Sequence, residues 1–272
     1  MIRNPNSAAT AVGVLIAALF IGLRVFRQVH PHPLTPYDSY IVFGAGIILV
    51  MLLMRTAVAA TVPGSYTFPD ARPEQYPQLD RATFDRYAAE LEGLGFQRAQ
   101  DFSLVGQGGV TIPSFCRLYV HPREKMYAEL AQIFPAGRSP LPVLCTMQTV
   151  FDNDWSLGVG NNQPQPAAVF LRNPHAVGKA MPGKSPFEVW QTHREWRQQM
   201  IQDLSIQPQS VSLEAYRAHQ QIRAQQRAER VRKGSFLAKL SMYYKRQVLP
   251  VYEWKGDWPK EAEKRGAPVF ER

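Results

Sequence analysis

The sequence predicts a membrane-anchored α+β protein, and three features of its patterning support this fold class. The first sixty of the 272 residues hold nearly all of the long uncharged apolar runs, the middle of the chain alternates as strands do, and the end is strongly basic. The apolar runs are too long for a plain soluble globule and too few for a polytopic transporter. We therefore expect two transmembrane helices, then a soluble domain of one helix and an antiparallel sheet, then two or more helices and a basic tail.

The first predicted span covers residues 8–26. From Ala8 to Leu23 the chain carries no charged residue, and a helix of about 20 residues crosses a hydrocarbon core. Arg24 lies near the end of this span, where its long side chain reaches the headgroups. A cleaved signal peptide is disfavoured because Arg24 and Phe26 stand where small residues are expected at a cleavage site.

The second predicted span covers residues 40–61. It is uncharged only from Tyr40 to Met54, so it crosses a membrane only if Arg55 and the residues after it are included. Arg55 is then either an interfacial residue that ends the apolar core or a group that pairs with a partner's carboxylate or a lipid phosphate. Two spans form a helical hairpin with both chain ends on one side, which makes the chain a multi-pass protein of the cell membrane.

The soluble part is expected to begin after a proline-rich linker at 63–82. Thr83 is the predicted N-cap of a helix whose apolar positions recur with helical spacing up to Gly95. Alternating runs then predict strands at 101–106, 115–120, 143–151 and 155–159, which complete an α+β domain over 83–175. The segment 124–134 fits a helix or a strand, and the sequence leaves this choice open.

A helical region is predicted over 185–246. Ser185, Pro186 and Glu188 form an N-terminal helix signal, and the helix runs to about Asp203 with Phe187, Trp190, Ile201 and Leu204 on its packing face. Ser212 opens the next helix. In the C-terminal tail, 247–272, Trp254 and Trp258 are expected to fold back onto the domain, with docking to a partner as the alternative.

The basic character is concentrated at the end of the chain. Residues 211–272 carry fourteen Lys and Arg against seven Asp and Glu, so +7 of the formal net charge of +9 lies there. Basic and aromatic residues interleaved in this way suit an anionic membrane surface, which favours the cytoplasmic side; a solvated helix face and a partner-binding helix are the alternatives. The candidate contacts are Arg55, Arg223, Arg227, Arg230, Arg232, Lys233, Phe236, Lys239, Tyr243, Tyr244, Lys245 and Arg246.

Few residues indicate chemistry. Cys116 and Cys145 each fall within a predicted strand, where a free cysteine is usually a small buried hydrophobe, and a disulfide between them stays open. Asp152 and Asp154 have the spacing with which some transferases hold a divalent metal, but the same letters form an ordinary hairpin turn. The sequence contains no G-x-G-x-x-G, Walker A or H-E-x-x-H stretch.

The function that this organisation favours is that of an accessory, assembly or scaffold component acting through protein and membrane-surface contacts. We assign no catalytic residue, metal ligand or cofactor. The expected partners are membrane lipid and either another protein or a second copy of the chain. Nucleic acid is disfavoured because no known nucleic-acid-binding motif accompanies the basic residues. The alternatives are a membrane-tethered metal-dependent transferase using Asp152 and Asp154, and a sensor of anionic lipid.

Overall fold

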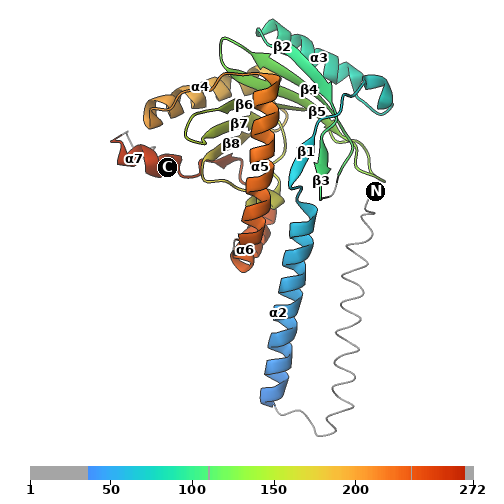
Figure 1. Ribbon diagram of the computed structural model, residues 1–272, viewed down its shortest axis with the longest axis vertical. Helices are drawn as coiled ribbons and strands as arrows, with labels where there is room; N and C mark the ends of the chain where they lie inside the picture. Colours follow the sequence, from blue (N-terminus) through green and yellow to red (C-terminus); the bar gives the residue numbers. More distant parts are fainter. Residues whose placement is uncertain (1–35, 110, 234, 267–272) are drawn as a thin grey trace.

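The computed structural model describes residues 36–109, 111–233 and 235–266, and it shows an α+β domain from which one long helix projects (Figure 1). This confirms the α+β class. The projecting helix is α2 (Pro36–Thr61). The first predicted span, residues 8–26, lies outside the described residues.

Helix α2 is the one helix in the described ranges that is long and apolar enough to cross a membrane, over Gly44–Thr61. Among its described side chains, several large apolar ones are exposed: Tyr40 is 74% exposed and Ile48 is 62% exposed. A helix that exposes this much apolar surface is suited to lipid rather than to water.

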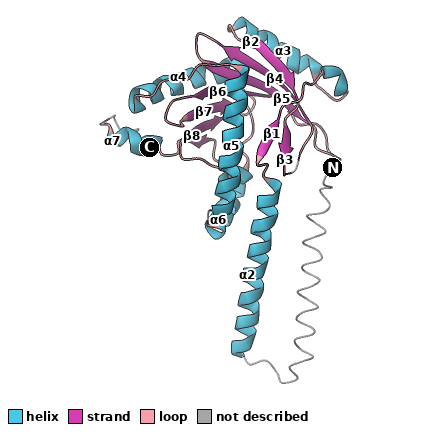
Figure 2. Ribbon diagram, viewed as in Figure 1, coloured by secondary structure: helices cyan, strands magenta, loops and turns pink. Residues whose placement is uncertain are grey.

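The domain is built on a seven-stranded sheet (Figure 2). Its spatial order is β2-β4-β5-β6-β7-β8-β9, and all neighbours are antiparallel except β7 and β8, which are parallel. The runs at 115–120, 143–151 and 155–159 are confirmed as strands, whereas the run at 101–106 is broken at residues 103–104 between two strands. The ambiguous segment at 124–134 is a strand, paired on both sides. The strands are β2 (Gln97–Phe102), β4 (Ser114–His121), β5 (Met126–Ile133), β6 (Leu144–Val150), β7 (Ser156–Gly160), β8 (Ala176–Ala180) and β9 (Glu253–Trp254).

The stretch predicted as an extended linker, 63–82, contains regular structure. Strand β1 (Ser65–Thr67) pairs with β3 (Val105–Gln107), and a 3-10 turn, η1, covers Pro73–Gln75. The linker prediction was wrong here because proline-rich composition does not report the backbone pairing that a distant strand supplies.

Two helices cover one face of the sheet. In α3 (Arg81–Gly93) the N-cap is Asp80, whose Oδ1 accepts from the Thr83 amide at 3.1 Å. The prediction of Thr83 as the cap was wrong by three residues, because the Asp80 carboxylate is an equally good acceptor and lies earlier in the chain. In α4 (Pro186–Leu204) the predicted capping box of Ser185 and Glu188 is confirmed.

The predicted packing face of α4 is confirmed for Trp190 and Ile201, which pack against the core, and is wrong for Phe187, which is 41% exposed. Val189 and Met200, which were not predicted, are fully buried against the sheet. Leu204 is buried as expected.

Helix α5 (Leu213–Lys233) crosses the opposite face of the sheet, in front of the strands in Figure 1. It is followed by α6 (Phe236–Val248), and the chain then returns through β9 to α7 (Trp258–Lys264). The indole of Trp258 is 1% exposed and donates to Asp203 Oδ2 at 2.9 Å, so the expected folding back of the tail is confirmed.

Candidate membrane-proximal surface and the polar cluster beneath α5

The end of α2 nearest the domain is packed against the C-terminal helices. Val231 of α5 lies in a small apolar cluster with Val169 and Phe170 of the 3-10 turn η2 (Pro166–Phe170), and residues of α2 and α6 close around it. The surrounding residues include Met51, Val58, Ala59, Val62, Leu240 and Tyr243. The domain is therefore attached to the candidate span by side-chain packing as well as by the chain itself.

Two of the predicted contact cations act within this junction. Arg55 of α2 donates to the main-chain carbonyl of Arg232, and Lys239 of α6 donates to that of Arg230. Both carbonyls lie in the last turn of α5, where carbonyl groups lack helical partners and the helix dipole favours positive charge. Arg55 thus has a partner in its own chain, and with Lys239 it joins three helices.

Helix α6 presents an apolar surface beside this junction. Leu237 is 60% exposed and Val248 is 80% exposed, and Tyr244 also faces outward. Lys245 is exposed among them, whereas Tyr243 turns inward, with its ring 5.9 Å from that of Phe170. Phe236 begins the helix. Apolar and basic groups on one short helix next to a candidate span are typical of an interfacial helix.

The remaining cations at this end divide into exposed and half-buried groups. Arg232 and Lys233 are exposed, and Lys233 forms an i,i+4 pair with Glu229 at 3.1 Å. Arg246 is half-buried near Arg172, and desolvation together with Arg246 lowers the pKa of Arg172. Such exposed pairs contribute little to stability, so these charges are available to an anionic surface.

Arg223, Arg227 and Arg230 are half-buried residues of α5. Arg227 donates to the Tyr66 hydroxyl at 3.3 Å. Arg223 forms no ion pair or hydrogen bond with any residue in the described ranges. Burial first and the neighbouring Arg227 second lower the pKa of Arg223 to about 9, and Arg227 also lowers that of Arg230 after burial.

A polar cluster lies beneath α5 that the sequence did not indicate. The Tyr216 hydroxyl donates to the Glu129 carboxylate, and the thiol of Cys116 lies 3.8 Å from the Ser114 hydroxyl. Burial raises the pKa of Glu129, while the bonds from Tyr216 and Cys116 oppose that rise. Burial also raises the pKa of the Cys116 thiol. The only sequence signal was an acidic residue within a run of strand residues, which solvent-facing positions also show.

The two cysteines are free and buried. Cys116 faces α5, and Cys145 belongs to the core on the other side of the sheet. The open choice between pairing and burial is settled by these positions in favour of burial.

The aspartate pair expected either as a turn or as a metal site lies in a turn. Asn153 and Asp154 both have positive φ, and Asp152 Oδ1 accepts from the Gln207 amide at 3.0 Å. Asp152 therefore tethers the β6–β7 turn to the segment after α4. Within the described ranges, His, Cys, Asp and Glu side chains form no group of three or more that could hold a metal ion.

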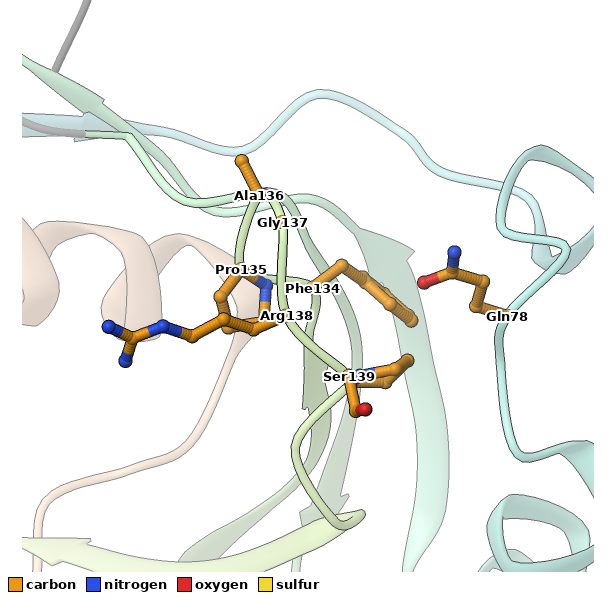
Figure 3. A pocket seen from close by; sticks show the side chains of 8 residues that line it. Gln78, Phe134, Pro135, Ala136, Gly137, Arg138 and Ser139 are labelled. Atoms are coloured by element: carbon orange, nitrogen blue, oxygen red, sulfur yellow. The ribbon is translucent and has the colours of Figure 1, made fainter. Parts of the chain in front are cut away.

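A shallow depression on the surface lies at the loop after β5 (Figure 3). Its lining includes Phe134, Gln78 and Arg138, and the figure shows Arg138 pointing away from Gln78. Since the polar groups do not converge, the depression offers no arrangement suited to catalysis.

Comparisons of the chain with models of protein families, with curated proteins and with solved structures find no match. The function is therefore argued from the geometry of the molecule alone.

Proposed function

We propose that this protein is a membrane-anchored binding component that acts as an accessory, assembly or scaffold subunit. Its α+β domain is held at the membrane surface by α2 and contacts the bilayer through α6 and the end of α5. The observation that carries the proposal is the junction in which Arg55 and Lys239 join α5 to α2 and α6. It fixes the basic end of the domain beside the helix that can cross a membrane.

The depth of the junction supports contact between α6 and lipid. Arg55 lies six residues before the end of α2 at Thr61, and the long arginine side chain can reach from such a position to headgroup level. Because Arg55 bonds the last turn of α5, that turn and the adjoining α6 lie at the same level. The exposed Leu237 and Val248 can then enter the interface while Lys245 remains among the headgroups.

The anchoring includes the hairpin topology predicted from the sequence. A second span at 8–26 returns the N-terminus to the side of the domain, and the basic tail favours the cytoplasmic leaflet, where anionic lipids attract Lys and Arg. Protein contacts, with another subunit or a second copy of the chain, then involve the surface of the domain that faces away from the lipid.

The lipid contact is tested by spin labels placed on α6 in the full chain reconstituted in bilayers containing anionic lipid. Labels at Leu237→Cys and Val248→Cys should be more accessible to oxygen than to a water-soluble nickel chelate, because oxygen concentrates in the hydrocarbon. The native cysteines are buried and should not label. A matched label at Gln225→Cys, exposed on α5, should show the reverse. Labels on α6 that behave like the one at Gln225 would contradict the proposal.

A further inference from the structure

The face of the sheet beneath α5 has open space where β6, β7 and β8 meet. Cross-strand pairing places Gln148 beside Gly158, and Gly158 beside Gly178. A side chain added at Gly158 would find no atom within 4 Å of its Cβ. One added at Gly160 would meet the Asn162 Oδ1 and Thr146 Oγ1 atoms, so polar oxygens border the same floor.

A buried polar side chain without a full set of partners stands at the edge of this open space. Gln148 is 8% exposed, and its Oε1 accepts from Gln220 of α5 at 3.5 Å. Its Nε2 has no hydrogen-bond partner among the described residues. Tyr127 fills the β5 side of Gln148, whereas Gly158 leaves the other side free. Buried amide donors are rarely left unpaired in folded proteins.

Helix α5 adds positive charge above the same place. Arg223 follows Gln220 by three residues, so it projects from the same side of the helix one turn later. His219 lies one turn before Arg223, and its Nε2 also has no partner among the described residues. Burial first and Arg223 second lower the pKa of His219 to about 4, so the ring is neutral at pH 7 and its nitrogen can donate a hydrogen bond.

No acid is among the groups that shift the pKa of Arg223, whose charged neighbours are Arg227 and Arg230. Glu129 of the sheet interacts with Arg227, and its carboxylate also accepts from the Tyr216 hydroxyl. A half-buried guanidinium beside two others is unfavourable unless an anion joins them. A phosphate group accepts hydrogen bonds from several directions, which matches donors that come from a helix and from a sheet.

We propose that Arg223, His219 and Gln148 bind the phosphate group of a small soluble molecule in the open space above Gly158. Lipid is the other source of this chemistry. However, Arg223 precedes the membrane-proximal end of α5 by ten residues, a distance of roughly 15 Å along the helix. That distance favours a soluble ligand over a headgroup.

Inorganic phosphate is the probe that tests the site. The full chain in neutral-lipid nanodiscs is unfolded by heat in sodium phosphate and in sodium chloride at matched ionic strength, so that general screening is equal. Phosphate should raise the melting temperature above that in chloride and give saturable binding by calorimetry. An equal melting temperature in the two salts would overturn the proposal.

Three variants separate a site from a general effect of charge. Arg223→Met and Gly158→Val should each weaken phosphate binding at least about tenfold, the first by removing the donor and the second by filling the space. Gly158→Val suits a strand and should leave the fold intact by circular dichroism. Arg232→Met, which removes an exposed cation of the same helix, should bind phosphate as the natural chain does. Equal losses in Arg223→Met and Arg232→Met would contradict the site.

A lipid arm distinguishes the two sources of phosphate. If nanodiscs containing phosphatidic acid raise the melting temperature through Arg223 and free phosphate does not, the ligand is a headgroup and the proposed soluble ligand is wrong. Arg223→Lys keeps the charge without the planar fork. It should retain part of the phosphate affinity that Arg223→Met loses, and a loss as large as that of Arg223→Met would count against direct contact.

Discussion

The two faces of the sheet differ in what they bury. The face under α3 and α4 carries the larger apolar core, in which Phe115, Leu130, Met147 and Leu157 are completely buried, although the Tyr119 hydroxyl and His193 Nδ1 also lack partners there among the described residues. The face under α5 buries Gln148 with an unpaired donor and places Glu129 and Arg223 nearby. Apolar burial is the main source of folding stability, whereas incompletely paired polar groups oppose it. The comparison teaches that the first face maintains the fold and that the second is the place to look for binding.

The largest loss of stability should come from the apolar face. Phe115 packs against the rings of Phe84 and Tyr76, so Phe115→Ala should lower the free energy of unfolding by about 3–5 kcal/mol. Chemical denaturation in detergent measures this. The control is Ile112→Ala, at a residue that is 46% exposed, with an expected change of less than about 0.5 kcal/mol. Similar losses in both variants would mean that this face is not the core.

The same face predicts a loss of stability in acid. His193 is fully buried, with its Nε2 3.4 Å from the Thr149 hydroxyl, and burial first and Arg197 second lower the pKa of His193 to about 3. The unfolded chain binds this proton below about pH 6.5 and the folded chain does not. Stability should therefore fall by up to about 1.4 kcal/mol per pH unit from pH 6.5 toward 3. His193→Gln should flatten this slope, and an unchanged slope would exclude His193 as its cause.

A smaller loss is expected from the hydrogen bond between Tyr216 and Glu129 on the polar face. Tyr216→Phe removes the hydroxyl that donates to Glu129 and leaves a half-buried carboxylate without that partner. The free energy of unfolding should fall by about 1–3 kcal/mol at neutral pH. Protonation of Glu129 relieves the defect, so the difference from the natural chain should shrink on acidification. A constant difference across the pH range would mean that only packing was lost.

Arg223→Met should sharpen the contrast, because it removes an unpaired cation from the polar face. In chloride alone, the free energy of unfolding should be unchanged or raised by about 0.5–1 kcal/mol. Arg117→Met is the opposite case, because the Arg117 guanidinium on the α3 side of the sheet is paired with Asp101 at 2.8 Å. This variant should lower the free energy of unfolding. A loss in Arg223→Met as large as that in Arg117→Met would show that Arg223 is structural.

The smallest effect on folding is expected on α6. Leu237→Ser replaces an exposed apolar side chain and should change stability in detergent by less than about 0.5 kcal/mol. Its effect should appear only in bilayers, as faster amide exchange of α6, because the helix loses apolar contact with lipid. Equal exchange of α6 in the variant and the natural chain would contradict lipid contact by Leu237.

The capping box at Ser185 was predicted because it depends on neighbouring residues alone. The cap of α3 was placed at Thr83 instead of Asp80, because both residue types cap helices. The parallel pairing of β7 with β8 and the return of Trp254 to the sheet join distant segments. No pattern within either segment reports them.

The candidate sites follow the same division. The basic segment was predicted as one contact surface, but its residues have separate roles that depend on neighbours far away in the chain. Lys239 caps α5, Arg227 bonds Tyr66, and Lys245 remains exposed. Glu129 and Gln148 were not predicted, because their importance comes from the helix that covers them. The sequence supplied the location of the charge, and packing determined which charges are free.

The central claim is that α2 holds the domain with α6 toward the bilayer and α3 away from it, as the positions of these helices relative to α2 in Figure 1 suggest. Energy transfer from a dye on the protein to labelled headgroups in nanodiscs tests it directly. A dye at Val248→Cys should transfer efficiently, and a dye at Asp85→Cys, exposed on α3, should transfer weakly. Equal transfer from the two positions, or stronger transfer from Asp85, would contradict the account.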